Sequence, residues 1–370
     1  MLRRSFVATP LLAAPLAAAH ADKRVFAYGD GVPHTPAEYA GLLESLTKSS
    51  TLEADDYSRG GVVAQLEQRM AARLGKEFAV WLPTGTLANH LAIRLLAGEQ
   101  RRVPMQAESH LFNDCGDCAQ TLSGLHLVPL AAGHATFTLD QAKAALLDST
   151  TGRVATPIGA MQIESPVRRR RGEVFDFAEM QRISSWARQN KIGMHLDGAR
   201  LFIEAAYTRR SVKDYARLFD TVYISQYKYF NAASGAILAG PRLLLENLFH
   251  TRRMFGGGLA QAWPYAAVAL HYLDGFEQRM QLAVDNSEKL FASLASNPRL
   301  SLERIPNGTN IARLKLQSGS PEAFMKQLAM SGIFLRPAVE GRFNVQVNET
   351  WGRVTTDFLS DAFHKASRQA

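Results

Sequence analysis

Short, largely apolar segments alternate with amphipathic segments through the middle of the chain, and this alternation limits the fold more than any other feature. The apolar segments "FAVWLP" at 78–83 and "TVYIS" at 221–225 are typical of strands buried on both faces of a sheet. Between them, residues 62–75 and 176–190 place apolar side chains at helical spacing. The pattern predicts an α/β fold with a mostly parallel sheet between layers of helices.

The length of 370 residues indicates more than one small domain, and a hydrophobic content of 46% is enough for a sizeable core. After residue 241 the order of predicted helices and strands changes, because two long helical stretches at 241–255 and 260–294 are followed by short strands. We therefore predict a small C-terminal α+β domain. The predicted divisions are an N-terminal arm at 22–58, a large domain at 59–265 and the small domain at 266–370.

The first 21 residues have the layout of an export signal. A basic start with Arg3 and Arg4 precedes an apolar, alanine-rich stretch and the small-x-small ending Ala19-His20-Ala21. The arginine pair resembles a twin-arginine signal. We predict export to the periplasm, with a cytoplasmic protein as the alternative.

The charge balance of the chain excludes few classes of function. The net charge is +8, and without the two arginines of the leader 40 basic residues face 34 acidic ones. The basic residues are dispersed except at 168–171, and nothing beyond charge supports nucleic-acid binding. No internal apolar tract reaches the roughly 18 residues of a membrane span. We predict a small-molecule partner, without nucleic acid or stable membrane insertion.

Two cysteines, Cys115 and Cys118, are spaced C-x-x-C within "FNDCGDCAQTL", which we predict to be one helix. The spacing fits a redox pair or half of a zinc site. No second cysteine pair exists to complete a zinc site. Two plain helical cysteines, a disulfide formed after export and a metal site all stay open.

The segment "MHLDGARLF" at 194–202 carries Asp197 at the end of a short strand, with Arg200 in the following turn. Ligands of open α/β sheets collect at the carboxyl ends of the strands, so both residues are candidates for a binding site. Taken alone, Asp197 could equally cap the next helix.

A second strand end, in "LPTGTLANH" at 82–90, is followed by Thr84, Gly85 and Thr86 and then by a helix. Backbone N–H groups at a helix N-terminus bind anions, and a glycine lets a phosphate approach closely. The alternative is an ordinary helix cap, and the segment is not a Walker loop.

Lys228 lies directly after the strand at 221–225, and His110 follows a polar turn in "ESHLFND". A strand-end lysine, a strand-end aspartate and a phosphate turn in one domain are the three parts that pyridoxal phosphate requires. The lysine binds the aldehyde, the aspartate keeps the ring nitrogen protonated, and the turn holds the phosphate. Together they indicate a pyridoxal phosphate enzyme.

These segments resemble the threonine aldolase and aromatic amino acid β-eliminating lyase family of fold-type-I pyridoxal phosphate enzymes. The matching stretches are "HLDGAR" at 195–200, "PTGTLANHLA" at 83–92, "ESHLF" at 108–112 and "RRMFGGGLAQAW" at 252–263. The resemblance implies a mostly parallel seven-stranded sheet, a homodimer or homotetramer, and a lyase that cleaves a β-hydroxy-α-amino acid to glycine and an aldehyde. The site residues it implies are Lys228, Asp197, Arg200, His110, Thr84, Gly85 and Thr86, with Lys228, His110 and Asp197 as the catalytic ones.

The residues expected to contact the substrate differ from the sequence pattern of the family. The stretch after Glu164 reads "ESPVRRRR" and lacks the histidine that in the family contacts the β-hydroxyl group, so the base is open between His110 and a water molecule. Candidate substrate-binding residues are Arg168, Arg342 and Tyr57. A solvated arginine loop and a packing tyrosine are the plain alternatives.

Three functions follow from the residues and the resemblance. The first is aldol cleavage of a β-hydroxy amino acid. The second is another pyridoxal phosphate reaction, namely β-elimination, racemisation or transamination. The third is a pyridoxal phosphate-binding protein without turnover.

Overall fold

The structure is a computed structural model, and it describes residues 22–370. The predicted export signal lies outside the described residues. The strands are β1 (Val25–Phe26), β2 (Phe78–Leu82), β3 (Arg102–Gln106), β4 (His126–Leu130), β5 (Ala160–Glu164), β6 (Gly193–Asp197), β7 (Thr221–Ser225), β8 (Ala236–Gly240), β9 (Leu300–Arg304), β10 (Ile311–Leu316), β11 (Ile333–Phe334) and β12 (Phe343–Gln346).

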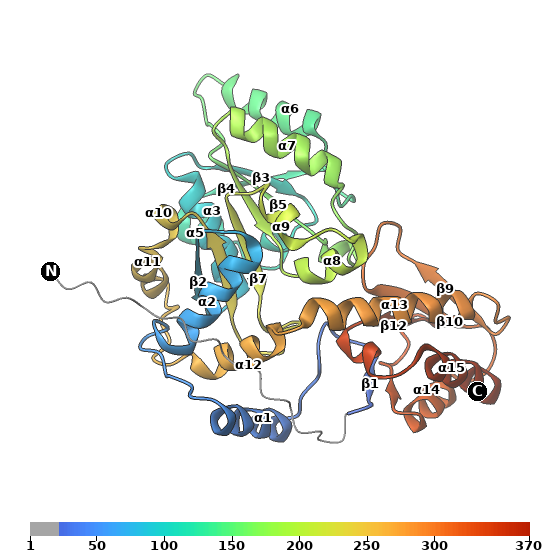
Figure 1. The fold of residues 1–370 in the computed structure, drawn as a ribbon. Helices are drawn as coiled ribbons and strands as arrows, with labels where there is room; N and C mark the ends of the chain where they lie inside the picture. Colours follow the sequence, from blue (N-terminus) through green and yellow to red (C-terminus); the bar gives the residue numbers. More distant parts are fainter. Residues whose placement is uncertain (1–21) are drawn as a thin grey trace.

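Helices cover the sheet and form much of the C-terminal part (Figure 1). The helices are α1 (Pro36–Ser49), α2 (Gly61–Leu74), α3 (Gly85–Ala97), α4 (His110–Asn113), α5 (Cys118–Ser123), α6 (Leu139–Thr150), α7 (Phe177–Gln189), α8 (Leu201–Thr208), α9 (Val212–Ala216), α10 (Arg242–Leu245), α11 (Leu248–Met254), α12 (Trp263–Leu273), α13 (Phe276–Leu294), α14 (Pro321–Met330) and α15 (Thr356–Gln369). Two 3₁₀ turns are η1 (Arg168–Arg170) and η2 (Glu349–Arg353).

The central sheet has the strand order β2-β8-β7-β6-β5. Strands β5, β6 and β7 are parallel, and β8 runs antiparallel to both of its neighbours. Strands β3 and β4 form a parallel pair beside β5, and a bridge between Arg102 and Ile158 joins β3 to the segment just before β5. The predicted mostly parallel α/β sheet is confirmed, with five strands hydrogen-bonded in one sheet and two in the neighbouring pair.

Several predicted helices are shorter in the structure than the sequence indicates. The stretch at 260–294 divides into α12 and α13, because Gly275 adopts a φ of 66° and leaves the helical region. The stretch at 241–255 divides at Asn247, whose dihedral angles lie outside the helix. The predicted helix around the cysteines is wrong, since Gly116 and Asp117 have φ of 58° and 51° and separate α4 from α5.

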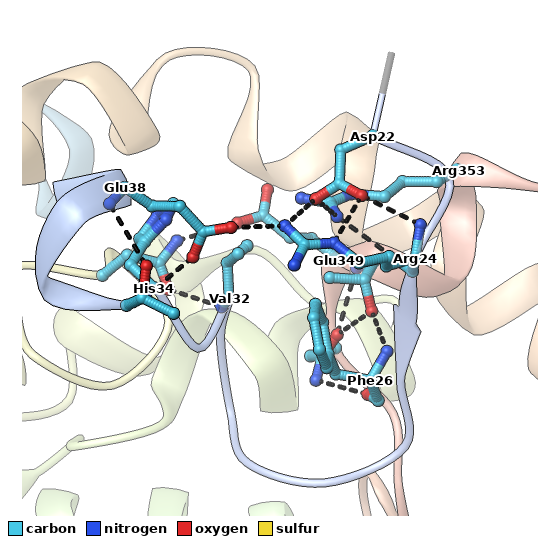
Figure 2. A network of polar contacts seen from close by, with 12 residues as sticks. Asp22, Arg24, Phe26, Val32, His34, Glu38, Glu349 and Arg353 are labelled. Atoms are coloured by element: carbon cyan, nitrogen blue, oxygen red, sulfur yellow. Dashed lines mark hydrogen bonds and ion pairs between the residues drawn. The ribbon is translucent and has the colours of Figure 1, made fainter. Parts of the chain in front are cut away.

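A group of ion pairs connects residues within the N-terminal arm, and one of the pairs joins the arm to the C-terminal part of the chain (Figure 2). Arg24 bonds Asp22 at 2.9 Å and Glu38 at 2.7 Å, and Arg353 bonds Asp22 at 2.8 Å. Strand β1 also pairs in parallel with β11. Exposed pairs of this kind contribute about 0.2–1 kcal/mol each, so strand pairing and burial hold the arm more firmly than the charges do.

The arm then passes directly over the loop that carries Lys228. The Val32 N–H donates to Asn231 Oδ1 at 2.7 Å, and Asn231 Nδ2 donates to Glu349 Oε1 at 3.1 Å. A Cβ on Gly31 would collide with Asn231 Oδ1 and with the carbonyl oxygen of Lys228, so only glycine fits there. This close approach brings the neighbouring Asp30 to the end of the sheet.

A three-stranded antiparallel sheet, with the order β12-β10-β9, packs with α13, α14 and α15 in the C-terminal part (Figure 1). This is the α+β arrangement expected after the large sheet. The boundary between residues 265 and 266 stays a prediction, since α12 packs against α2 of the large domain. Within residues 22–370, no helix combines the length and apolarity that crossing a membrane requires.

Candidate active site

A cavity of about 430 Å³ opens at the carboxyl ends of β5, β6 and β7. Ligands of α/β sheets bind at this edge. Six of the residues predicted from the sequence line it, and the structure adds six more. The predicted ones are Gly85, His110, Arg168, Asp197, Arg200 and Lys228; the added ones are Asp30, Asn89, Glu164, Ala199, Tyr223 and Tyr227.

Asp197 ends β6 and is held by a buried chain of hydrogen bonds. Its Oδ2 accepts from Asn89 Nδ2 at 2.6 Å, and its Oδ1 accepts from the Ala199 N–H at 3.2 Å. Asn89 Oδ1 lies 2.9 Å from His195 Nε2, and His195 Nδ1 lies 2.9 Å from Thr221 Oγ1. The amide orientation therefore requires the proton of His195 on Nε2.

Burial lowers the pKa of His195 to about 3, so this ring is neutral at physiological pH. A neutral ring with its proton on Nε2 donates to Asn89, and Asn89 in turn donates to Asp197. These contacts fix the orientation of the Asp197 side chain in the lining of the cavity, which goes beyond the helix cap that the sequence left open.

Lys228 follows β7 by three residues and stands on a rigid base. The next two residues, Tyr229 and Phe230, are fully buried, and their rings lie 5.2 Å and 5.1 Å from that of Phe276. The Lys228 Nζ points back to Tyr227 and donates to its Oη at 3.3 Å. Burial lowers the pKa of the Lys228 amine, and the positive charge of Arg200 lowers it further. A lowered pKa favours the neutral amine that nucleophilic chemistry needs.

Arg200 is paired with a residue that the sequence analysis missed. Its Nε donates to Asp30 Oδ2 at 2.9 Å. Asp30 Oδ1 also accepts from Gln346 Nε2 at 2.7 Å, which connects the site to the C-terminal sheet. Burial opposes the charge of Arg200, but the carboxylates of Asp30 and Glu164 leave its pKa raised. Arg200 is therefore a permanent cation in the cavity.

The turn before α3 has the geometry of an anion site. Thr84 is the N-cap, and its side chain accepts from the Leu87 N–H at 3.2 Å, while the first N–H groups of the helix have no partner within it. A Cβ on Gly85 would collide with the hydroxyl group of Tyr223, so glycine is required for packing. Gly85 lines the cavity; Thr84 and Thr86 flank it outside the lining.

His110 begins α4 and lines the same cavity as Lys228. The Sγ of Cys115 lies 3.3 Å from His110 Nδ1 and 3.6 Å from Thr86 Oγ1. The contact with Cys115 raises the pKa of His110. Both cysteines carry free thiols and are half-buried. Within residues 22–370, no group of acidic, histidine and cysteine side chains is arranged to bind a metal ion.

Glu164, at the end of β5, joins two parts of the site through backbone contacts. Its Oε2 accepts from the His110 N–H at 2.6 Å, and its Oε1 accepts from the Arg168 N–H at 2.8 Å. Burial and the nearby charge of Asp197 raise the pKa of Glu164 to about 8. Glu164 thus fixes the backbone of two residues that face the cavity.

Two predicted substrate residues are not brought to this cavity. Arg342 lies in the C-terminal sheet region, where its guanidinium group pairs with Glu303. Tyr57 is 40% exposed, and its ring contacts the guanidinium group of Arg253 at 4.6 Å. Neither residue belongs to the lining of the cavity.

The site residues that the sequence analysis did not identify differ in how clearly the sequence indicates them. Asn89 is a polar residue one turn after Gly85, among the mostly apolar buried side chains of α3, and this position was a usable signal. Tyr223 is one of five consecutive buried residues of β7, so the sequence does not distinguish it from the rest of the core. Asp30 comes from the distant arm, and only the folded chain places it beside Arg200.

Comparison with known proteins agrees with this geometry. Residues 45–316 match the family model of the beta-eliminating lyases. The low-specificity L-threonine aldolase of Candida albicans is 26% identical over 281 residues, covering 75% of this chain and 74% of that one. The alanine racemase TOXG of Cochliobolus carbonum is 29% identical over 231 residues, which are 62% of this chain but only 58% of the racemase, less than two thirds of its length.

Among solved structures, a Listeria monocytogenes protein named as an L-allo-threonine aldolase superposes with a TM-score of 0.76. The alignment covers 95% of this chain and 98% of that one at 26% identity. A threonine aldolase of Leishmania major has the same fold at 16% identity, with a TM-score of 0.69. The fold is that of the fold-type-I pyridoxal phosphate enzymes, and the chain belongs to the beta-eliminating lyase family.

Proposed function

We propose that the protein is a pyridoxal phosphate-dependent lyase that cleaves a β-hydroxy-α-amino acid to glycine and an aldehyde. One observation carries the proposal: Lys228, Asp197 and the N-terminal turn of α3 face a single cavity. The threonine aldolases among the relatives support the choice of reaction.

The residues present fit this cofactor in their chemistry. Lys228 provides an amine with a lowered pKa, Asp197 a buried carboxylate, and the turn at Gly85 a helix N-terminus suited to a phosphate. Pyridoxal phosphate, when bound, supplies an aldehyde that reacts with amines and a ring that accepts electrons. The cavity of about 430 Å³ lies within the range of small-molecule sites.

The residues of the chain would then divide the work. Asp197 would hold the ring nitrogen and its proton. Arg200 would bind the phenolic oxygen, and the His110 ring would cover one face of the cofactor. Since His110 Nδ1 is occupied by Cys115, its Nε2 is the atom available to take the hydroxyl proton of the substrate, directly or through water.

An absorbance spectrum of the purified protein tests the cofactor assignment. The wild type should show the visible-edge band of a lysine-bound cofactor, and Lys228→Ala should lose it. A band that persists unchanged in Lys228→Ala would overturn the assignment of the lysine.

Product analysis tests the reaction. With L-threonine, L-allo-threonine and phenylserine, the lyase should release glycine and the matching aldehyde in equal amounts. Formation of a keto acid would instead indicate β-elimination or transamination, and conversion of L-alanine to its enantiomer would indicate racemisation. A spectrum that responds to amino acids without any product would favour a binding protein.

We also propose a homodimer or homotetramer that is exported to the periplasm. The assembly rests on the family resemblance, and export rests on the layout of residues 1–21. Light scattering of the purified protein tests the first. Fractionation of cells that produce the full chain tests the second, and a mature protein confined to the cytoplasm would contradict it.

A further inference from the structure

Three lysine or arginine side chains line the cavity, and they differ in whether they already have a hydrogen-bonding partner. Arg200 is bonded to Asp30 at 2.9 Å. Lys228 donates to Tyr227, and in the proposed function it holds the cofactor. For Arg168, the only carboxylate within ion-pair range among residues 22–370 is that of Asp114, at 3.8 Å, which is beyond hydrogen-bond distance.

The neighbours of Arg168 explain why the carboxylate of Asp114 does not form a hydrogen bond with it. Asp114 is bonded at 2.9 Å by Arg169, and Arg170 is bonded to Glu173 at 3.0 Å. The side chain of Arg168 makes no hydrogen bond to any described residue. Within η1, therefore, the two following arginines are engaged with acids, while Arg168 has an unused planar fork of N–H donors.

The backbone of Arg168 is nevertheless held in place. Its N–H donates to Glu164 at 2.8 Å, and the preceding Val167 is fully buried. The same carboxyl group accepts from the N–H of His110 at 2.6 Å. Because one buried side chain fixes both residues, Arg168 starts from a defined point on the cavity wall. Its side chain is 56% exposed and lines the cavity, so it lies at the mouth, where the cavity opens to solvent.

We propose that the guanidinium group of Arg168 binds a carboxylate of the amino acid substrate. The planar fork of arginine matches a carboxylate with two parallel hydrogen bonds. Every amino acid brings its α-carboxylate, and an acidic β-hydroxy amino acid such as 3-hydroxyaspartate brings a second one on the side chain. Cleavage of 3-hydroxyaspartate between Cα and Cβ moves the hydroxyl proton to Cα and gives glycine and glyoxylate, so no further reactant is needed.

The inference rests on the proposed function, and ligand binding tests it separately from turnover. The absorbance of the cofactor-loaded enzyme is titrated with L-alanine, which has one carboxylate, and with L-aspartate, which has two. Cleavage of L-threonine and of 3-hydroxyaspartate is measured in parallel. The variants are Arg168→Ala and Arg168→Lys, with Arg170→Ala as a control that removes the same charge from the same turn and leaves the pair of Arg169 with Asp114 intact.

Loss of a bidentate, charge-assisted contact should weaken binding about 10- to 100-fold in Arg168→Ala. Arg168→Lys should recover part of the loss, since it keeps the charge but not the fork. If Arg168 binds the α-carboxylate, the affinities for both titrants fall together. If it binds the side-chain carboxylate, only L-aspartate and 3-hydroxyaspartate are affected. Either result supports the inference.

Equal affinities in Arg168→Ala and Arg170→Ala for both titrants would overturn it, as would a wild-type enzyme whose absorbance responds to neither amino acid. Failure of the proposed function has a different signature. A wild type that binds both titrants but releases no glycine is not a lyase, and the role of Arg168 is then decided by the titrations alone.

Discussion

Replacing Asn89 by leucine tests whether the hydrogen-bond chain behind Asp197 supports cofactor binding. Leucine has nearly the shape of asparagine but can neither donate nor accept. In the variant, Asp197 Oδ2 loses its donor at 2.6 Å, and the buried His195 Nε2–H loses its acceptor at 2.9 Å. The Ala199 N–H remains as a weaker donor at 3.2 Å.

The structure gives the size of the effect. A hydrogen bond to a charged group contributes about 1.5–3 kcal/mol, and a buried donor left unpaired costs about 1–3 kcal/mol. Because the two groups are coupled, we expect the free energy of unfolding to fall by about 3–5 kcal/mol. The Asp197 side chain also loses a contact that fixes its orientation in the cavity, so cofactor affinity should fall about 10-fold or more.

A matched control separates stability from function. Asn286 is also buried and donates to the carbonyl oxygens of Trp351 and Val354, at 3.2 Å and 3.0 Å, far from the cavity. Asn286→Leu should destabilise the protein but leave cofactor affinity unchanged. Urea unfolding of the cofactor-free proteins and absorbance titration with pyridoxal phosphate measure the two quantities. An Asn89→Leu variant as stable as the wild type, or an equal loss of cofactor affinity in Asn286→Leu, would refute the reasoning.

Three further predictions concern packing, pH and the surface. Gly85→Ala should weaken cofactor binding more than 10-fold, because its Cβ collides with the Tyr223 hydroxyl, whereas Gly41→Ala, which meets open space, should not. Burial raises the pKa of Glu204 to about 8 from 4.5, so its contribution to stability is lost as pH rises towards 8. Relative to Glu204→Gln, the wild type should lose up to about 4 kcal/mol of unfolding free energy between pH 5 and pH 9, and parallel pH profiles would contradict this. Arg342→Ala should change the free energy of unfolding by less than about 1 kcal/mol and leave the affinity for amino acids unchanged. Weaker binding of amino acids by this variant would instead support the substrate-binding role of Arg342 that the sequence predicts.

Most of the residues proposed to bind the cofactor could be predicted because local sequence patterns mark their positions. Asp197 ends one short strand, Lys228 follows another, and Gly85 begins the helix after a third. The ends of parallel strands meet at one edge, so these residues could be placed together without coordinates. The fold class followed from the same alternation of strands and helices.

The missing part of the site depends on contacts between distant segments. Asp30 reaches Arg200 only because Gly31 allows the arm to lie against the loop of Lys228. No local pattern in the arm announces this approach. The helix breaks at Gly275 and Gly116 were missed for another reason, since the apolar spacing continues through both positions and only the backbone angles reveal the change.

The two ends of the cavity also differ in how much the fold constrains them. The cofactor end is tied into the core through Asn89 and His195, where one substitution is expected to cost several kcal/mol. The other end includes η1, whose arginines are exposed, and substitutions at such positions usually change stability by about 0.5 kcal/mol or less. Residues at the mouth can therefore change without loss of the fold or of the cofactor site. Relatives named for aldol cleavage and for racemisation resemble this chain to a similar degree, at 26% and 29% identity. The threonine aldolase match covers 75% of this chain and 74% of that one, against 62% and 58% for the racemase, and so supports aldol cleavage. We expect the residues at the mouth, Arg168 foremost, to select the substrate of that reaction.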